Sequence, residues 1–226
     1  RSFERPAKPA VIKASVPVVR VQNVSAAYGK VPVLHDVSFD IHKGRTVAVV
    51  GESGSGKSTA ARCITGLLPP TRGSIAFNGE DLPPSYKRRN KEQLRTAQMI
   101  YQMADTALNP RQKIKDIIGR PVEFYRGLSG KARNARVAEL LEQIELEPAE
   151  YMERLPSELS GGQKQRIGIA RALAADPEFI ICDEVTSALD QLVAEGILKL
   201  LAKLQDELGL AYMFITHDLA TVKAIA

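Results

Sequence analysis

The sequence has little of several features that would narrow its class. It contains only two cysteines, Cys63 and Cys182, which are too few for a disulfide framework. Both lie in apolar segments, so we expect small buried residues of a protein in a reducing compartment. The sequence also contains no run of eighteen apolar residues, the length that a transmembrane helix needs. It therefore predicts neither a disulfide-stapled nor a membrane-spanning protein.

Residues 1–18 lack the features of a folded or targeting segment. They start with Arg1 rather than Met, lack the apolar block of a signal peptide, and are rich in Pro, Ala, Val and Lys without helical or strand period. We interpret them as a linker or tail. Residues 1–20 carry +4 of the formal net charge of +5, so the other 206 residues carry +1. Because the basic charge is concentrated in the tail, we expect no nucleic-acid partner.

The rest of the chain alternates predicted strands with predicted helices. Its 226 residues are 44% hydrophobic, which is enough for a sizeable core. The apolar runs "VAVV", "FIIC" and "AYMFIT" predict buried strands, and "GSIAFNGEDL" predicts a strand that ends in an Asn-Gly turn. Amphipathic helices are predicted by two stripes of apolar residues, Val137, Leu140, Leu141 and Ile144, and Val193, Ile197, Leu200, Leu201 and Leu204. This order predicts an α/β fold with a mostly parallel sheet and a helical insertion at about residues 113–158.

A glycine-rich loop, "GESGSGKST" at residues 51–59, follows the first buried strand and opens a helix. Glycines let backbone N–H groups curl around phosphate oxygens without Cβ clashes, and the helix directs its positive end at the same oxygens. Lys57 would reach the β- and γ-phosphates, and the Ser58 hydroxyl would bind Mg²⁺. A plain glycine turn explains the glycines but not Lys-Ser at this offset. The loop therefore predicts a nucleotide-binding site.

Polar residues that end other predicted strands favour hydrolysis over mere binding. Asp183 ends the strand "FIICD", where ligands of open α/β sheets bind, and we expect it to hold Mg²⁺ through water. Glu184 follows it as the candidate general base. Gln102 follows "MIY" and has an amide able to reach Mg²⁺ or water. His217 follows "MFIT", where it could hydrogen-bond the γ-phosphate.

A second glycine turn, formed by Ser160, Gly161 and Gly162 in "LSGGQ", opens another helix after the helical insertion. If both turns served one phosphate in one chain, the second turn would be redundant. Two chains placed head to tail about a two-fold axis remove the redundancy, because the turn of one chain then covers the nucleotide of the other. A simple helix cap is the alternative reading of this turn.

These motifs, together with "SALD" and "ITHD", resemble the ATP-binding cassette of ABC transporters over about residues 20–226. The resemblance implies an α/β P-loop NTPase with a RecA-like, mostly parallel sheet, an antiparallel β subdomain and a helical subdomain at about residues 104–172. It also implies an ATP sandwich dimer with a second cassette. In that dimer Tyr28 stacks on adenine, Asp190 crosses the interface, and Gln102 marks the loop that touches an integral-membrane permease.

The candidate site residues fall into three sets. The catalytic candidates are Glu184, His217 and Gln102, and the candidates for binding Mg²⁺ are Ser58, Gln102 and Asp183. The candidates for binding ATP are Tyr28, Ser53, Gly54, Ser55, Gly56, Lys57, Ser58, Thr59, Ser160, Gly161, Gly162, Gln163 and Asp190.

A narrower resemblance is to importers of dipeptides, oligopeptides or nickel. It is carried by "ALNPRQKIKDII", "LPSELSGGQKQRIGIARALAADPEFIICDEVTSALD" and "LGLAYMFITHDLATVKAIA". It implies an ATPase at the cytoplasmic face of the inner membrane that works with permease subunits and, indirectly, with a periplasmic or extracellular solute-binding protein. The sequence departs from this family after Gln102, where Met-Ala-Asp replaces the common Asp-Pro.

The sequence ends nine residues after His217, and the resemblance leads us to expect that it lacks strands and a helix that family members carry beyond this point. We expect their loss to leave the strand "AYMFIT" with an unpaired edge and exposed apolar surface. With the tail, this leads us to expect that residues 19–226 are a C-terminally truncated cassette, the second of two fused in a longer polypeptide. A single-cassette protein with a tag scar or a disordered start is the alternative.

Other functional classes compete with an importer ATPase. An ABC ATPase that acts on DNA would separate the cassette halves with long coiled coils, but only 56 residues lie between Gln102 and Leu159. A translation-factor type that acts on ribosomes stays open. The basic run "YKRRNK" at residues 86–91 is its only candidate RNA patch, although such a run is more often a solvated face. A plain P-loop kinase or GTPase leaves "LSGGQ" unexplained.

Overall fold

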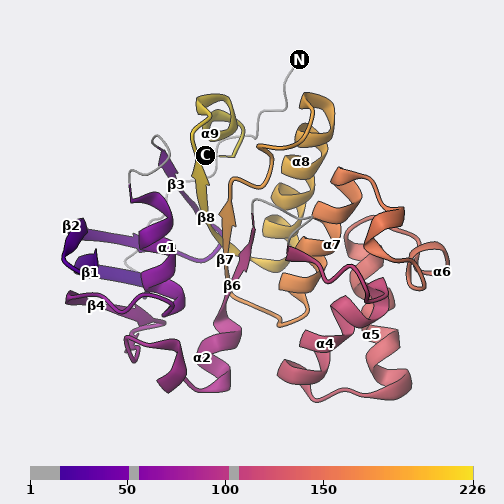
Figure 1. Cartoon of the computed structure of the whole chain (residues 1–226), viewed down its shortest axis with the longest axis horizontal. Coiled ribbons are helices and arrows are strands. Elements are labelled where there is room, and N and C mark those ends of the chain that lie inside the picture. The colour runs from indigo at the N-terminus through magenta and orange to yellow at the C-terminus, as the bar shows by residue number, and fades with distance from the viewer. Residues whose placement is uncertain (1–15, 51–55, 102–106, 226) are drawn as a thin grey trace.

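The computed structural model describes residues 16–50, 56–101 and 107–225. Figure 1 shows three layers: an antiparallel sheet with helix α1, a parallel sheet in the middle, and helices α7 and α8 on its other side. The antiparallel sheet has the order β2-β1-β4-β5 and comprises β1 (Val19–Tyr28), β2 (Val31–Ile41), β4 (Arg72–Phe77) and β5 (Glu80–Asp81). The predicted strand "GSIAF" is confirmed, and the chain turns at Asn78 and Gly79 to pair β4 with β5.

The parallel sheet has the order β3-β8-β7-β6. Its strands are β3 (Thr46–Val50), β6 (Ala97–Ile100), β7 (Phe179–Asp183) and β8 (Ala211–Thr216). The predicted parallel sheet is therefore confirmed. Because all four strands run the same way, their carboxyl ends meet at one edge, and the loops that follow them lie there in a row.

Alternate residues of β7 pack on opposite faces of this sheet. Phe179 and Ile181 join the core beneath the antiparallel sheet and α1 (Lys57–Thr65), whereas Ile180 and Cys182 join the core beneath α7 (Gly161–Leu173) and α8 (Gln191–Leu208). Covering both faces requires a continuous apolar strand, which explains the run "FIIC".

Both cysteines are free and buried, as predicted. Burial raises the pKa of the Cys63 thiol to about 11 and shifts the pKa of the Cys182 thiol further in the same direction. Neither thiol therefore ionises near neutral pH, which fits two packing residues rather than reactive ones.

The expectation that the strand "AYMFIT" has an unpaired edge is wrong. This strand is β8, which lies between β3 and β7, and all six of its residues are buried. The hydroxyl of Tyr212 donates to the carbonyl oxygen of Leu201 in α8 at 2.7 Å, so even its polar atom is satisfied. The physical reason is topological: the last strand of the sequence enters the middle of the sheet, where neighbours on both sides cover its backbone.

The predicted helical insertion is confirmed as helices. They are α4 (Ile114–Arg126), α5 (Gly130–Gln143), α6 (Pro148–Tyr151) and the 3₁₀ turn η2 (Pro156–Glu158), and they lead into α7. The stripe predicted on α5 faces the core, because Val137, Leu140, Leu141 and Ile144 are all fully buried. In the described part of the chain no helix is long and apolar enough to cross a membrane.

Asp176 ties these helices to the parallel sheet. It precedes β7, and its carboxylate accepts from Arg126 at the end of α4 and from Arg136 in α5, both at 3.0 Å. Each pair is only partly exposed, and the two share one carboxylate, so the three side chains form a small network. The insertion is thus attached to the strand that carries Asp183.

The run "YKRRNK" is not a solvated face throughout. It spans the 3₁₀ turn η1 (Tyr86–Arg88) and the start of α2 (Lys91–Thr96), and between them Arg89 is buried. Its guanidinium donates to the carbonyl oxygens of Ile64 and Cys63 at the end of α1. Burial lowers the pKa of Arg89 to about 10. A cation held against the last carbonyls of a helix also complements the negative end of the helix dipole.

Replacing Arg89 by methionine should destabilise the fold. The substitution takes the Arg89 donor away from the buried carbonyl oxygen of Ile64, whereas the carbonyl oxygen of Cys63 still accepts from the N–H of Gly66. We expect a loss of about 2 kcal/mol of unfolding free energy. For a domain of this size that loss lowers the melting temperature by about 6 °C. The matched control is Arg88→Met, because Arg88 is an exposed neighbour. Calorimetry that gives Arg89→Met the parental melting temperature would show that the buried guanidinium does not stabilise α1.

Candidate functional site

Helix α1 starts where the glycine-rich loop ends. Of that loop, Ser53, Gly54 and Ser55 lie outside the described residues. Gly56 is the N-cap, with a left-handed φ of 88°, and a Cβ there would lie 3.2 Å from the carbonyl oxygen of Val33. No side chain of the described residues caps α1. The N–H groups at the very start of the helix are therefore directed at the space where an external anion would bind.

The first residues of α1 differ in how exposed their side chains are. Lys57 is its first residue, and Ser58 is exposed. Thr59 is buried, and its N–H donates to the carbonyl oxygen of Gly56 at 3.1 Å. Ser58 is therefore the better placed of the two hydroxyl groups to meet a ligand at the end of α1.

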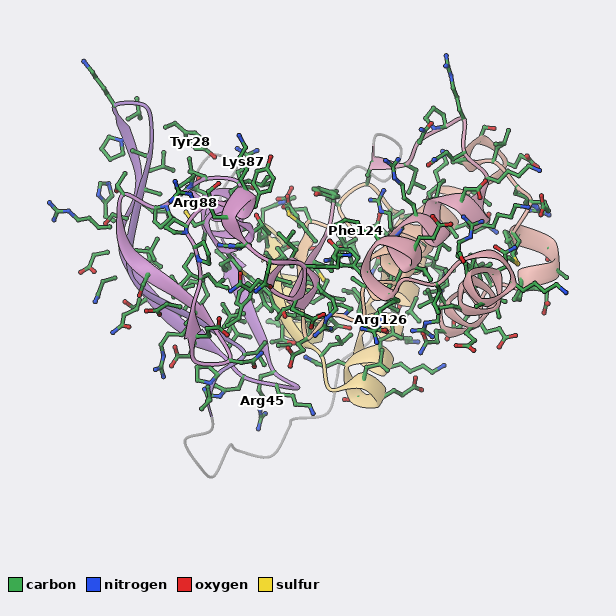
Figure 2. All side chains as sticks on the ribbon, turned by 90° about the horizontal axis from the view of Figure 1, so that it is seen from below. Tyr28, Arg45, Lys87, Arg88, Phe124 and Arg126 are labelled. Carbon is green, nitrogen blue, oxygen red and sulfur yellow. The ribbon has the colours of Figure 1, made fainter. Side chains whose placement is uncertain are left out.

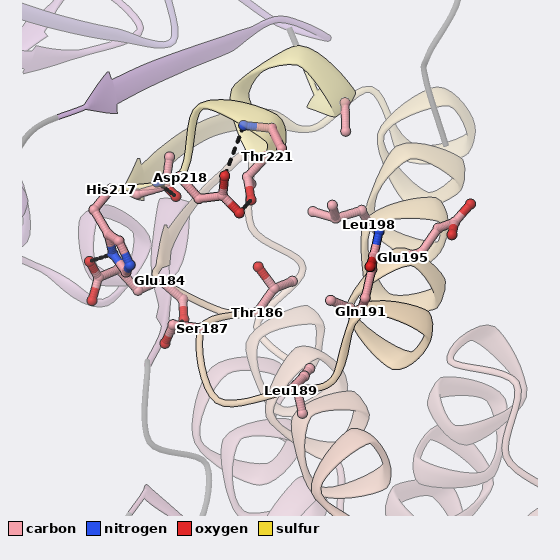
Figure 3. Close-up of a pocket in the computed structure, with 14 residues that line it drawn as sticks. Glu184, Thr186, Ser187, Leu189, Gln191, Glu195, Leu198, His217, Asp218 and Thr221 are labelled. Carbon is pink, nitrogen blue, oxygen red and sulfur yellow. Dashed lines mark hydrogen bonds and ion pairs between the residues drawn. The ribbon is translucent and has the colours of Figure 1, made fainter. Parts of the chain in front are cut away.

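Two carboxylates and a histidine come together at the carboxyl ends of β7 and β8. Asp183 ends β7, and the next residue, Glu184, holds its Oε1 2.9 Å from Nδ1 of His217, which follows β8 (Figure 3). The backbone N–H of Glu184 donates to the carbonyl oxygen of Ile215 at 2.8 Å, which ties the two strand ends together. The sequence predicted these three residues at strand ends, and the sheet order places them side by side.

Glu184 has an unusual backbone. Its φ of 48° lies in the left-handed region, which costs a non-glycine residue on the order of 1 kcal/mol and is concentrated at functional sites. The Glu184 side chain is 14% exposed and the His217 side chain 60% exposed. They line one end of a cavity of about 400 Å³ between α8 and α9 (Leu219–Ile225). Glu184 is thus partly shielded from water, yet reachable.

The turn "SGG" opens α7 through a capping box. The Ser160 hydroxyl accepts from the N–H of Gln163, and the Gln163 side chain accepts from the N–H of Ser160, at 3.2 and 2.9 Å. A Cβ on Gly162 would lie 2.6 Å from Cγ1 of Val193 in α8, so this glycine permits close packing. Ser160 and Gly161 are exposed. The turn therefore does cap α7, and the exposed side of Ser160 and Gly161 stays accessible to another molecule.

The two glycine turns serve helices on opposite faces of the parallel sheet. Helix α1 packs against one face and α7 against the other (Figure 1). This arrangement agrees with the expectation that one chain does not bring both turns to one phosphate.

The remaining candidates lie at the rim of these elements. Asp190 accepts from the N–H of Val193 at 2.9 Å and so caps α8. Tyr28 ends β1, is 41% exposed, and hydrogen-bonds Arg62 of α1. Gln102 lies outside the described residues, and Tyr101 before it is exposed. Arg62 was not predicted, because no spacing in the sequence links it to a residue 34 positions earlier.

Beside Tyr101 a groove of about 750 Å³ separates β6 from α4. It is lined by polar and aromatic residues that include Arg120, Phe124 and Arg171. The Phe124 side chain is 51% exposed, and burial lowers the pKa of Arg171. The guanidinium of Arg171 donates to the carbonyl oxygen of Ala107 at 2.6 Å, so it fixes the wall of the groove.

The family described as "ABC transporter" matches residues 34–187, from β2 through the segment that follows Glu184. The chain belongs to the ABC transporter family. The α/β fold with a parallel and an antiparallel sheet is therefore that of the ABC cassette, as predicted. It is similar to the structure of cbiO1 from Clostridium perfringens, described as part of the ABC transporter complex cbiONQ. The TM-score is 0.80 at 27% identity, over 92% of this chain and 81% of that one.

Two curated ABC proteins illustrate the closer similarity. The chain is 47% identical over 203 residues to the oligopeptide transport ATP-binding protein OppF of Bacillus subtilis, covering 88% of this chain and 65% of OppF. It is 44% identical over 211 residues to the nickel import ATP-binding protein NikE of Brucella suis, covering 93% of this chain and 79% of NikE. The chain spans between 50% and 65% of the length of its peptide-transport relatives.

Proposed function

We propose that this ABC cassette binds ATP with Mg²⁺ and hydrolyses it to drive an importer of peptides or nickel. The observation that carries the proposal is the shared edge of the parallel sheet. There, β3 leads in the sequence to the glycine-rich loop, β7 ends in Asp183 and is followed by Glu184, and β8 is followed by His217. In the sheet β8 lies between β3 and β7. A phosphate chain bound at the start of α1 would lie beside those acids.

The residues present suit a nucleotide and its metal. The uncapped first turn of α1 offers N–H groups to phosphate oxygens, and Lys57 adds a positive charge. The exposed Ser58 hydroxyl and the Asp183 carboxylate offer the oxygen ligands that Mg²⁺ prefers. When bound, Mg²⁺ neutralises charge that develops on the phosphate oxygens.

Glu184 acts as the general base in this proposal. Its carboxylate takes a proton from the attacking water. Because the Glu184 side chain is largely buried, few water molecules surround this carboxylate. His217 holds the carboxylate through the contact of 2.9 Å and so limits the directions in which it points. Since Glu184 is also fixed by its backbone bond to Ile215, the base is held on β8 as well as on β7.

The second glycine turn completes the site of another cassette. Ser160 and Gly161 are exposed at the start of α7, on the opposite face of the sheet from α1. The positive end of α7 then faces the nucleotide of the partner, and Asp190 lies near the same interface. This head-to-tail arrangement gives two equivalent sites per dimer.

The groove beside Tyr101 is the docking site that we assign to the permease. It is lined by Tyr101, which precedes Gln102 in the sequence, and offers exposed aromatic surface at Phe124, with arginines on its walls. Such a surface suits a short helical element with both apolar and acidic side chains. The protein then lies at the cytoplasmic face of the inner membrane, and the solute-binding protein acts on it through the permease.

Reconstitution tests this function. The full-length protein, placed with its permease subunits in lipid vesicles, should hydrolyse ATP faster when its solute-binding protein carries cargo, and EDTA should abolish the activity. Separate arms with an oligopeptide and with nickel identify the cargo. The Phe124→Asp variant should keep the unstimulated rate and lose the stimulation, because it alters only the groove. Stimulation by ribosomes instead of the permease would contradict the proposal.

A further inference from the structure

Arg62, in the last turn of α1, contacts Tyr28 at the end of β1. Its Nη1 donates a hydrogen bond of 2.6 Å to the phenolic oxygen. The guanidinium carbon lies 5.9 Å from the centre of the ring, at the outer limit of a cation–π contact. The hydrogen bond is therefore the main link, and Arg62 holds the ring at its hydroxyl.

Tyr28 needs such a link because its position does not fix the ring. It is the last residue of β1, paired with Val31 across a tight turn at Gly29, whose φ is 60°. Figure 2 shows it at the outer surface, on the side of the molecule formed by the antiparallel sheet. Tyr28 is 41% exposed at the tip of a hairpin, so core packing does not lock its ring, and holding the ring in one rotamer costs conformational entropy.

Arg62 is suited to supply that restraint. In the described part of the chain its guanidinium has no carboxylate within salt-bridge distance, and the phenol is its side-chain hydrogen-bond partner. It also belongs to the helix that Lys57 opens. Lys57 and Arg62 are five positions apart in the helix, which is roughly 7.5 Å along the axis. One rigid element therefore carries both the phosphate-binding turn and the residue that holds the ring.

We propose that Arg62 is a positioning residue for the nucleotide base. It fixes the Tyr28 ring relative to the start of α1, so that adenine stacks on a ring already in place when the phosphates bind. The Tyr28 ring then loses less conformational freedom when ATP binds, so the affinity for ATP is higher than with a freely rotating ring. The inference rests on the proposed function, since it requires that this site binds ATP and that Tyr28 stacks on the base.

The test compares a ligand that has a base with one that has none. In the full-length protein, Arg62→Met and Tyr28→Phe should each raise the dissociation constant for ATP about fivefold. The double variant should be no weaker than the weaker single variant, because both remove the same bond. Arg62→Lys should recover part of the loss. Inorganic tripolyphosphate, measured by competition, should bind all of these variants as it binds the parent.

Two controls separate the possible failures. Arg72→Met removes an exposed arginine of β4 and should not change ATP affinity, whereas Tyr28→Ala should weaken it. If Tyr28→Ala binds ATP more weakly than the parent and Arg62→Met binds it equally well, the role of Arg62 is overturned while base stacking on Tyr28 stands. Equal losses for ATP and tripolyphosphate also overturn it, because they indicate damage to α1. An unaffected Tyr28→Ala variant overturns base stacking, and a parent protein that binds neither ligand contradicts the proposed function itself.

Discussion

The Glu184→Gln variant should hydrolyse ATP about a hundred- to ten-thousandfold more slowly than the parent protein. Glutamine keeps the size of the side chain and the contact with His217, but its amide cannot accept a proton from water. In the proposed site the nucleotide binds to the start of α1 and not to Glu184, so we expect unchanged ATP affinity. Single-turnover hydrolysis and equilibrium binding, measured on the full-length protein, separate the two quantities.

The control for this variant is a carboxylate in the same cavity. Glu195 of α8 lines the same cavity as Glu184, on its other side (Figure 3), and pairs with Lys199 at 3.6 Å, but it does not contact His217 in the described structure. Glu195→Gln should therefore keep the parental rate. A Glu184→Gln variant that turns over ATP at the parental rate would remove Glu184 from the role of base.

The Ser160→Arg variant should lose about a hundredfold or more in hydrolysis, because it blocks the start of α7 where a partner's nucleotide would lie. Ser160 is exposed, so the new side chain has room in the isolated chain and the fold should survive. The variant does lose a helix cap, worth about 1 kcal/mol of stability. Ser160→Ala loses the same cap without adding bulk, and it should keep most of the activity.

The comparison of these two variants decides between a cap and a shared site. If Ser160 only caps α7, Ser160→Arg and Ser160→Ala should be equally active after correction for stability, measured by thermal unfolding. If α7 faces a nucleotide, only the arginine variant should be inactive. Equal, near-parental rates would leave the turn "SGG" with no function beyond the capping box.

Patterns that depend on near neighbours in the sequence predicted much of this fold. The strand "FIIC" is continuous and apolar because both of its faces are covered, and the stripe on α5 is buried as its spacing predicts. Asp183, Glu184 and His217 could be placed at strand ends for the same reason. Since parallel strands share one edge, placing residues at strand ends was enough to bring them together.

What could not be predicted depends on contacts between distant segments. The sequence of a single strand does not determine its place in the sheet. We therefore expected β8 to have an unpaired edge, whereas it lies between β3 and β7. Arg89 belongs to a run that looks solvated, but its guanidinium reaches acceptors at the end of α1, 25 residues earlier. The bond between Arg62 and Tyr28 is of the same kind.

The central claim is that each ATP site is built from two cassettes, and mixing two inactive variants tests it most directly. Ser160→Arg keeps an intact glycine-rich loop, and Lys57→Ala keeps an intact second turn. Half of the dimers in an equal mixture contain one of each, and each of these has one intact composite site, so activity should recover to about a quarter of the parental rate. Mixed dimers demonstrated by mass spectrometry that show no recovery over the separate variants would contradict the shared site.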